Sequence, residues 1–93
     1  MNIIQSPLFA RKVKEFHKDQ KLELDKVINK IVRDPRIGEE KRGDLKDIFI
    51  YKFKIKTIQY LLAYRFTEDL LELITISPHE NYYRDLKIYL KSK

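Results

Sequence analysis

Three lysines alternate with apolar side chains in residues 48–56, which read Ile-Phe-Ile-Tyr-Lys-Phe-Lys-Ile-Lys. A strand repeats every two residues, so Lys52, Lys54 and Lys56 are predicted to leave one face about 7 Å apart, close to the spacing of successive phosphates. Arg65, on the next predicted strand, would add a forked donor suited to a phosphate oxygen. The pattern indicates a surface for an anionic ligand. A solvated outer sheet face, with lysines that discourage edge aggregation, explains it equally well.

The C-terminal part of the chain holds the other candidates for chemistry. His79 would begin the last predicted helix, where the dipole favours a neutral imidazole that could move a proton. Tyr82 and Tyr83 would point about 100° apart on a helix, so one of them could stack on a base or donate a proton. Arg84 could clamp a phosphate or pair with Glu80, four residues before it. The structural alternative is a surface histidine and two tyrosines at the edge of the core.

The composition favours one packed domain, residues 1–93, with an anionic partner. Hydrophobic residues make up 43% of the chain and aromatic residues 12%, enough for a core. The absence of cysteine excludes disulfides, thiolate metal sites and a cysteine nucleophile, and it fits a reducing cytoplasm. No apolar run approaches the ~20 residues of a membrane span, so we expect a cytoplasmic protein without a membrane partner. The net charge of +6 indicates nucleic acid, an acidic protein, or both.

The predicted elements begin with helices. Residues 2–5 form a candidate edge strand, and Ser6-Pro7 reads as an N-cap followed by proline at the first helical position. Apolar residues at helical spacing predict one helix over about 7–18 and a second over about 21–33, with a tight break at Asp19-Gln20. The two helices would form a hairpin.

The second half reads as a sheet. Strands are predicted over 47–55, 59–66 and 70–77, joined by loops short enough for hairpins. Ser77-Pro78-His79-Glu80 reads as a capping box that starts a final helix from about 78 to 91. We therefore expect an α+β domain, with an N-terminal helical hairpin packed on an antiparallel sheet. The sheet would contain the short N-terminal edge strand and the three-stranded meander, and a short C-terminal helix would follow.

The ordered set of motifs resembles the RelE/ParE toxin superfamily of bacterial toxin–antitoxin modules. These motifs are the helical hairpin, Pro35-Arg36, Arg42-Gly43-Asp44-Leu45, Tyr51-Lys52-Phe53-Lys54, Leu61-Leu62-Ala63-Tyr64-Arg65 and His79-Glu80-Asn81-Tyr82-Tyr83-Arg84. The resemblance implies a compact toxin, without a metal or other cofactor, that is inhibited by an antitoxin wrapped around it. RelE-like members cleave mRNA, usually on the ribosome, whereas ParE-like members poison DNA gyrase and lack the nuclease residues.

Carried over by position, Lys52 and Lys54 match the paired strand lysines of the nuclease members. His79 and the tyrosines after it fall where those members keep a C-terminal His, Arg or Tyr. One departure is that Leu61 stands where nuclease members place an arginine, for which Arg65 is the local substitute.

The leading hypothesis is a metal-independent endoribonuclease that cleaves mRNA and so inhibits translation. Lys52 and Lys54 would stabilise charge and supply the base, Arg65 would bind the scissile phosphate, and His79, Tyr82 or Tyr83 would be the acid. Further phosphate contacts would come from Lys46, Lys56 and Arg84. The alternatives are an inhibitor of DNA gyrase, which is not an enzyme, and a degenerate toxin that acts only with its antitoxin in repression of their operon. In each case the antitoxin should be acidic or amphipathic and cover the lysine face, where Ile48 and Ile50 would leave apolar surface.

Overall fold

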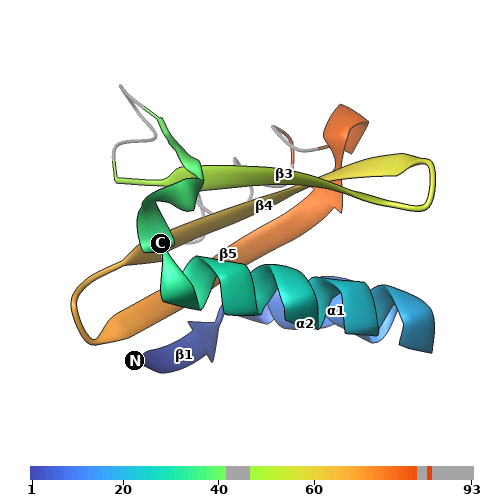
Figure 1. Cartoon of the computed structure of the whole chain (residues 1–93). Coiled ribbons are helices and arrows are strands. Elements are labelled where there is room, and N and C mark those ends of the chain that lie inside the picture. The colour runs from blue at the N-terminus through green and yellow to red at the C-terminus, as the bar shows by residue number, and fades with distance from the viewer. Residues whose placement is uncertain (42–46, 82–83, 85–93) are drawn as a thin grey trace.

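Two helices pack against one face of a five-stranded sheet in this computed structural model, which describes residues 1–41, 47–81 and 84 (Figure 1). The strand order is β1-β5-β4-β3-β2. The elements in chain order are β1 (Asn2–Gln5), α1 (Pro7–Lys14), α2 (Lys18–Arg33), the short 3-10 helix η1 (Pro35–Ile37), β2 (Glu39–Glu40), β3 (Phe49–Ile55), β4 (Ile58–Phe66), β5 (Leu70–Pro78) and the 3-10 helix η3 (His79–Asn81). The α+β arrangement predicted from the sequence is confirmed.

The helical hairpin forms as predicted but turns earlier. α1 begins at Pro7 after the N-cap Ser6, as expected, and ends at Lys14. The break predicted at Asp19-Gln20 is wrong, because both residues lie in the first turn of α2. The Gln20 side chain accepts a hydrogen bond of 2.7 Å from the backbone N–H of His17, and this contact starts the helix at Lys18.

The sheet is mixed. The meander β3-β4-β5 is antiparallel, as predicted, whereas β1 pairs with β5 in parallel, with Ile3 opposite Leu71. A two-residue strand that the sequence did not predict, β2, pairs with β3 and forms the other edge. The last hairpin strand, β5, therefore lies inside the sheet, between β1 and β4 (Figure 1).

A β-bulge interrupts the pairing of β4 with β5. Ala63 pairs with Thr75 but Tyr64 pairs with Leu73, so Ile74 is the extra residue. The Ser6 hydroxyl donates a hydrogen bond of 2.5 Å to the Ile74 carbonyl and accepts one of 3.0 Å from the N–H of Phe9. One buried side chain therefore caps α1 and satisfies a carbonyl at the bulge.

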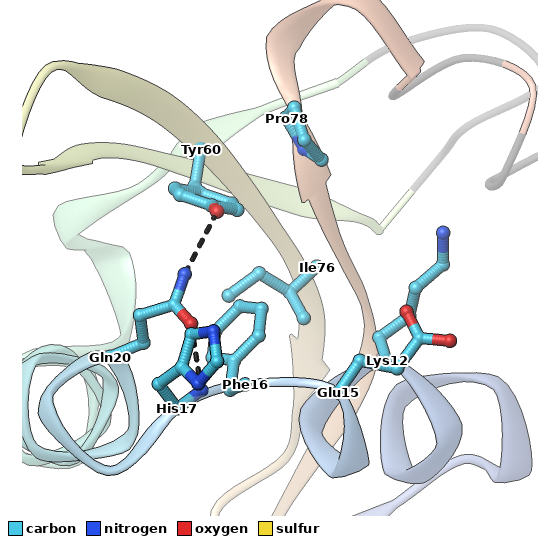
Figure 2. Close-up of a pocket in the computed structure, with 8 residues that line it drawn as sticks. All are labelled: Lys12, Glu15, Phe16, His17, Gln20, Tyr60, Ile76 and Pro78. Atoms are coloured by element: carbon cyan, nitrogen blue, oxygen red, sulfur yellow. Dashed lines mark hydrogen bonds between the residues drawn. The ribbon is translucent and has the colours of Figure 1, made fainter.

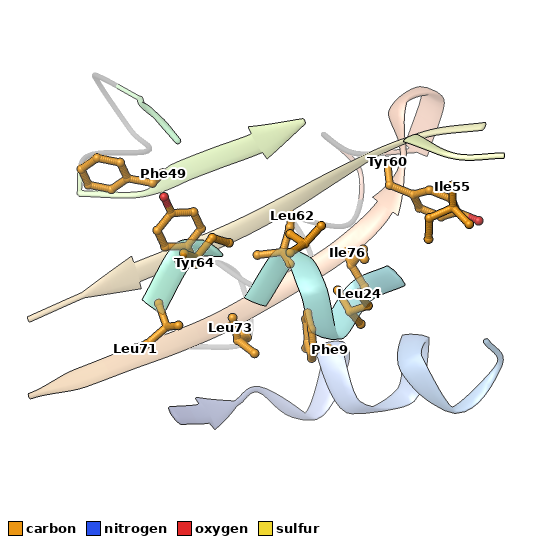
Figure 3. Packing of buried hydrophobic residues seen from close by; sticks show 12 residues of the cluster. Phe9, Leu24, Phe49, Ile55, Tyr60, Leu62, Tyr64, Leu71, Leu73 and Ile76 are labelled. Carbon is orange, nitrogen blue, oxygen red and sulfur yellow. The ribbon is translucent and has the colours of Figure 1, made fainter. Parts of the chain in front are cut away.

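The bulge sets which side chains of β5 enter the main core. Strict alternation from Leu71 and Leu73 would continue to Thr75, but the extra residue turns Ile76 toward the helices instead. Figure 3 shows Leu71, Leu73 and Ile76 beside one residue from each helix, Phe9 of α1 and Leu24 of α2. The predicted apolar face of β3, formed by Phe49, Tyr51, Phe53 and Ile55, belongs to this core.

The opposite face of the sheet is also apolar at its centre. A second cluster contains Ile48, Ile50, Leu61, Ala63 and Ile74. Ile48 and Ile50 are only 1% and 2% exposed. The expectation that these two residues leave apolar surface beside the lysines is therefore wrong.

Tyr64 fastens η1 to the sheet. Its hydroxyl donates a hydrogen bond of 2.6 Å to the Pro35 carbonyl and accepts one of 3.0 Å from the Gly38 N–H. Burial raises the pKa of the Tyr64 hydroxyl, and the Gly38 N–H opposes that shift. A Cβ on Gly38 would lie 2.6 Å from the tyrosine oxygen and 3.0 Å from the Ile50 carbonyl oxygen, so the close approach requires glycine.

The capping box predicted at Ser77 is wrong. Ser77 lies inside β5, where it pairs with Leu61 and is 1% exposed, and β5 continues through Pro78. Strand pairing outweighs the local capping signal here, and the chain turns at η3 instead. The rest of the predicted final helix lies outside the described residues, apart from Arg84. No helix in the described part of the chain is long and apolar enough to cross a membrane.

Substitution of Ser6 by alanine tests the contact at the bulge. Ser6→Ala removes both the cap of α1 and the bond to Ile74, so we expect the free energy of unfolding to fall by about 1–3 kcal/mol in chemical denaturation. The exposed neighbour Gln5 provides the control, and Gln5→Ala should change stability by no more than about 0.5 kcal/mol. Equal stability of Ser6→Ala and the wild type would contradict the role assigned to the hydroxyl.

A double-mutant cycle tests the contact between Gly38 and Tyr64. Gly38→Ala should destabilise the fold because the new methyl group meets the tyrosine oxygen. Tyr64→Phe removes that oxygen, so the double variant should be more stable than the sum of the two single changes predicts, by about 0.5–3 kcal/mol. Additive losses would show that the two residues do not act on one another.

Candidate functional site

Lys52 and Lys54 lie on the sheet face opposite the helices, near the end of the β3-β4 hairpin. Lys52 pairs across the sheet with Leu61, and Lys54 pairs with Gln59. Both lysines are exposed. Within residues 1–41, 47–81 and 84, neither amine makes an ion pair or a hydrogen bond, so two cations stand side by side without a counter-charge.

His79 lies at the same end of the sheet. β5 leaves the sheet at Pro78, which pairs with Tyr60, so His79 follows next to the row that contains Gln59 and Lys54. Adjacent strands are about 4.8 Å apart, which places the backbone of Pro78, the last residue of β5, roughly 10 Å from that of Phe53 across β4. The imidazole is exposed. Lys52, Lys54 and His79 therefore lie toward the same end of the sheet.

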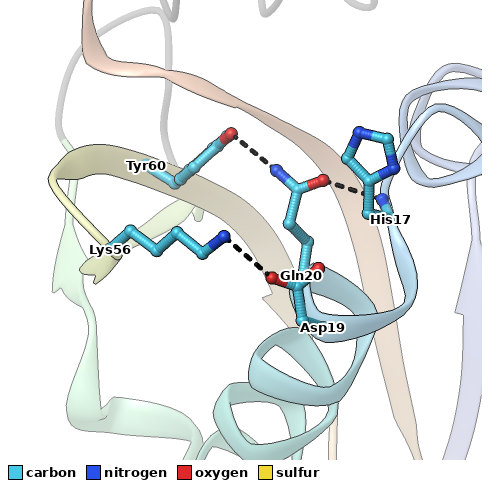
Figure 4. A network of polar contacts seen from close by, with 5 residues as sticks. All are labelled: His17, Asp19, Gln20, Lys56 and Tyr60. Atoms are coloured by element: carbon cyan, nitrogen blue, oxygen red, sulfur yellow. Dashed lines mark hydrogen bonds and ion pairs between the residues drawn. The ribbon is translucent and has the colours of Figure 1, made fainter.

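Lys56 does not continue the lysine row. It lies in the two-residue turn between β3 and β4 and has a φ of 57°. The alternation of the strand ends there, and the Lys56 amine reaches the helix side of the sheet, where it pairs with Asp19 at 3.2 Å (Figure 4). The prediction that Lys56 binds phosphate beside Lys54 is wrong for this reason.

Arg65 is also separated from the lysines. It lies six steps along β4 from Gln59, which corresponds to roughly 20 Å. Its Nε donates to Glu72 on β5 at 3.1 Å, so its charge is already opposed. Arg65 shares the face of the lysines, as predicted. That it substitutes for the family arginine at the position of Leu61 stays a prediction. Leu61 itself is 3% exposed and belongs to the second apolar cluster.

Four of the predicted residues add nothing to this geometry. Lys46, Tyr82 and Tyr83 lie outside the described residues. Arg84 is exposed, and its contact with phosphate stays a prediction. In the described part of the chain no three His, Asp or Glu side chains gather as a metal-binding group.

The sequence did not predict a pocket of about 380 Å³ beside this end of the sheet. Figure 2 shows it on the helix side, where the turn between α1 and α2 meets β4 and β5. It is lined by Lys12, Glu15, Phe16, His17, Gln20, Tyr60, Ile76 and Pro78. Only the Gln20 contact that starts α2 had a local sequence signal, because the capping pattern could have been read from His17 and Gln20.

Comparison with known proteins gives the class first. The fold is similar to a chain of the intact E. coli RelBE toxin–antitoxin complex, with a TM-score of 0.64 and 17% identity over 81% of this chain and 92% of that chain. It is also similar to the isolated E. coli RelE toxin, with a TM-score of 0.63 and 18% identity over 91% of this chain and 94% of that one. No curated protein sequence matches the chain. These two likenesses show that the fold, two helices on a five-stranded sheet, is shared with the E. coli RelE structures.

The family follows from the sequence itself. The model of the ParE-like toxin of type II bacterial toxin–antitoxin systems matches residues 3–87. The chain belongs to this family and is a type II toxin of the RelE/ParE kind.

The ion pair of Lys56 makes a titration prediction. The hydrogen bond from the Lys56 amine lowers the pKa of the Asp19 carboxyl below its ordinary value. Lys56→Gln should therefore raise the pKa of Asp19, measured by NMR titration, whereas Lys54→Gln should leave it unchanged. Because the folded-state pKa is depressed, the contribution of Asp19 to stability is present above its ordinary pKa and is lost as pH falls through the folded value. An unchanged Asp19 pKa in Lys56→Gln would contradict the pairing.

Proposed function

We propose that this toxin is an endoribonuclease that cleaves mRNA and thereby inhibits translation. The observation that carries the proposal is the pair of exposed strand lysines, Lys52 and Lys54, which have no counter-charge in the described part of the chain. Lys56 and Arg65, by contrast, are held by Asp19 and Glu72. Cations that remain free on one face are suited to a polyanionic strand.

The proposed reaction is an intramolecular phosphoryl transfer. The 2′-oxygen of a ribose attacks the adjacent phosphorus, its proton goes to the amine of Lys52 or Lys54 acting as the base, and the bond from phosphorus to the 5′-oxygen breaks. Lys52 and Lys54 would hold the phosphate and oppose the charge that develops on its oxygens. His79, next to the same row of the sheet, would give a proton to the leaving 5′-oxygen. These residues supply charge and proton transfer without a bound metal.

The proposed partner, besides mRNA on the ribosome, is an antitoxin. The solved E. coli RelBE structure is a toxin–antitoxin complex. We expect the antitoxin of this chain to be acidic, because it must neutralise a protein of net charge +6 whose strand lysines are unpaired. Both proteins would act in the cytoplasm.

A gyrase inhibitor is the second candidate, and one observation favours it. The matching family model is that of ParE-like toxins, and Leu61 occupies, as a buried residue, the position at which nuclease members carry an arginine. Under this alternative, Lys52 and Lys54 would contact a protein surface, and replication would stop while transcripts stay intact.

Brief induction of the toxin in bacteria separates the candidates. Primer extension on an abundant mRNA should show new 5′ ends, and Lys54→Ala should reduce them about 10²-fold or more and relieve growth arrest. Lys56→Ala is the matched control: it removes a lysine two residues away that is held by Asp19, and it should cut like the wild type. Intact transcripts with arrested DNA synthesis would overturn the nuclease and support the gyrase inhibitor. The absence of both effects would leave only a role with the antitoxin in repression.

A further inference from the structure

The pocket between the helical turn and the sheet has walls suited to a flat ring. Phe16 and Tyr60 meet edge to face, with ring centroids 5.6 Å apart and an interplanar angle of 67°. Pro78 and Ile76 complete the apolar lining (Figure 2). A volume of about 380 Å³ lies at the lower end of the range for small-molecule sites, which suits one aromatic ring system better than a larger ligand.

The Gln20 amide, which lines this pocket together with the polar side chains of Lys12, Glu15 and His17, is held by two hydrogen bonds. The Gln20 Oε1 accepts from the His17 N–H at 2.7 Å, and Gln20 Nε2 donates to the Tyr60 hydroxyl at 3.4 Å (Figure 4). An amide has two donors and two acceptor positions, so these contacts leave Gln20 one N–H and one lone pair. An amide with one N–H and one lone pair left can donate to a ring nitrogen of a base and accept from an exocyclic amino group, the two groups that adenine offers.

The pocket adjoins the candidate site. Two of its lining residues, Tyr60 and Pro78, are register partners. Gln59, which precedes Tyr60, pairs with Lys54, and His79 follows Pro78. The pocket lies on the helix side and Lys52 and Lys54 lie on the opposite face, so an RNA strand that contacts both would pass around this end of the sheet.

We propose that the pocket receives one nucleobase of the RNA strand whose phosphate lies on Lys52 and Lys54. This inference rests on the proposed function and deepens it. Gln20 would determine which base is preferred, and the rings of Phe16 and Tyr60 would form the surface on which the base stacks. Stacking on aromatic side chains accepts any base, so the amide is the element that distinguishes one base from another.

Titration of the full chain with each of the four nucleoside 5′-monophosphates tests the site directly. The backbone amide signals of Phe16, Gln20 and Tyr60 should shift saturably in NMR spectra, with one nucleotide bound more tightly than the others. In Gln20→Glu the side chain keeps an oxygen for the His17 N–H but loses its free N–H, so the fold should persist while the preferred nucleotide binds about tenfold more weakly. The same variant should lose the base preference at the cleavage sites mapped in induced cells.

Asn29→Asp is the matched control. It makes the same change from amide to carboxylate at an exposed position of α2, and it should leave nucleotide affinity and base preference unchanged. The proposal is overturned if no nucleotide shifts the three amides, or if Gln20→Glu cuts with the wild-type base preference. If a nucleotide binds in the pocket and transcripts stay intact, the nucleotide site stands and the nuclease function fails, so the two results are distinguishable.

Discussion

The hydrogen bond from the Ser6 hydroxyl to the Ile74 carbonyl is the contact on which the arrangement of this toxin depends. It is made at the β-bulge, where one extra residue in β5 shifts the pairing with β4. The shift directs Ile76 into the main core and places Pro78 opposite Tyr60. A strand without the bulge would carry the opposite set of side chains to each face from this point onward. The register of the end of β5, where the candidate site lies, therefore depends on the bulge that the Ser6 hydroxyl contacts.

The second organising principle is the distribution of counter-charges among the basic residues. Lys56 and Arg65 belong to the same basic stretch as Lys52 and Lys54, but each of them faces a carboxylate. Surface pairs of this kind contribute little to stability. They divide the basic residues of β3 and β4 into paired cations, Lys56 and Arg65, and two lysines without a counter-charge in the described part of the chain. Lys52 and Lys54 therefore differ from the other basic residues of these strands in having no carboxylate beside them in the described part of the chain, and residue type alone does not show this.

The sequence predicted what local periodicity determines. Alternation in residues 48–55 identified β3 and its core face, and Ser6-Pro7 located the start of α1 correctly. It could not predict contacts made between distant segments or by turn geometry. The positive φ of Lys56 reverses the expected direction of its side chain, and Glu72 reaches Arg65 only through strand pairing. Three separate segments of the chain line the pocket, so no single stretch of sequence predicts it. Ser77 shows the converse, since its local capping signal was overruled by pairing with Leu61.

The parallel pairing of β1 with β5 has a consequence for the order in which the chain can fold. Ser6 and Ile74 are 68 residues apart, and β5 is the strand that joins β1 to the rest of the sheet. Until β5 has been synthesised, β1 and α1 have no sheet neighbour to pack against, and closing so long a loop slows the step that joins them. A growing toxin chain therefore lacks its packed core and its assembled sheet until most of its residues have been translated. The topology therefore delays assembly of the complete sheet to the end of synthesis.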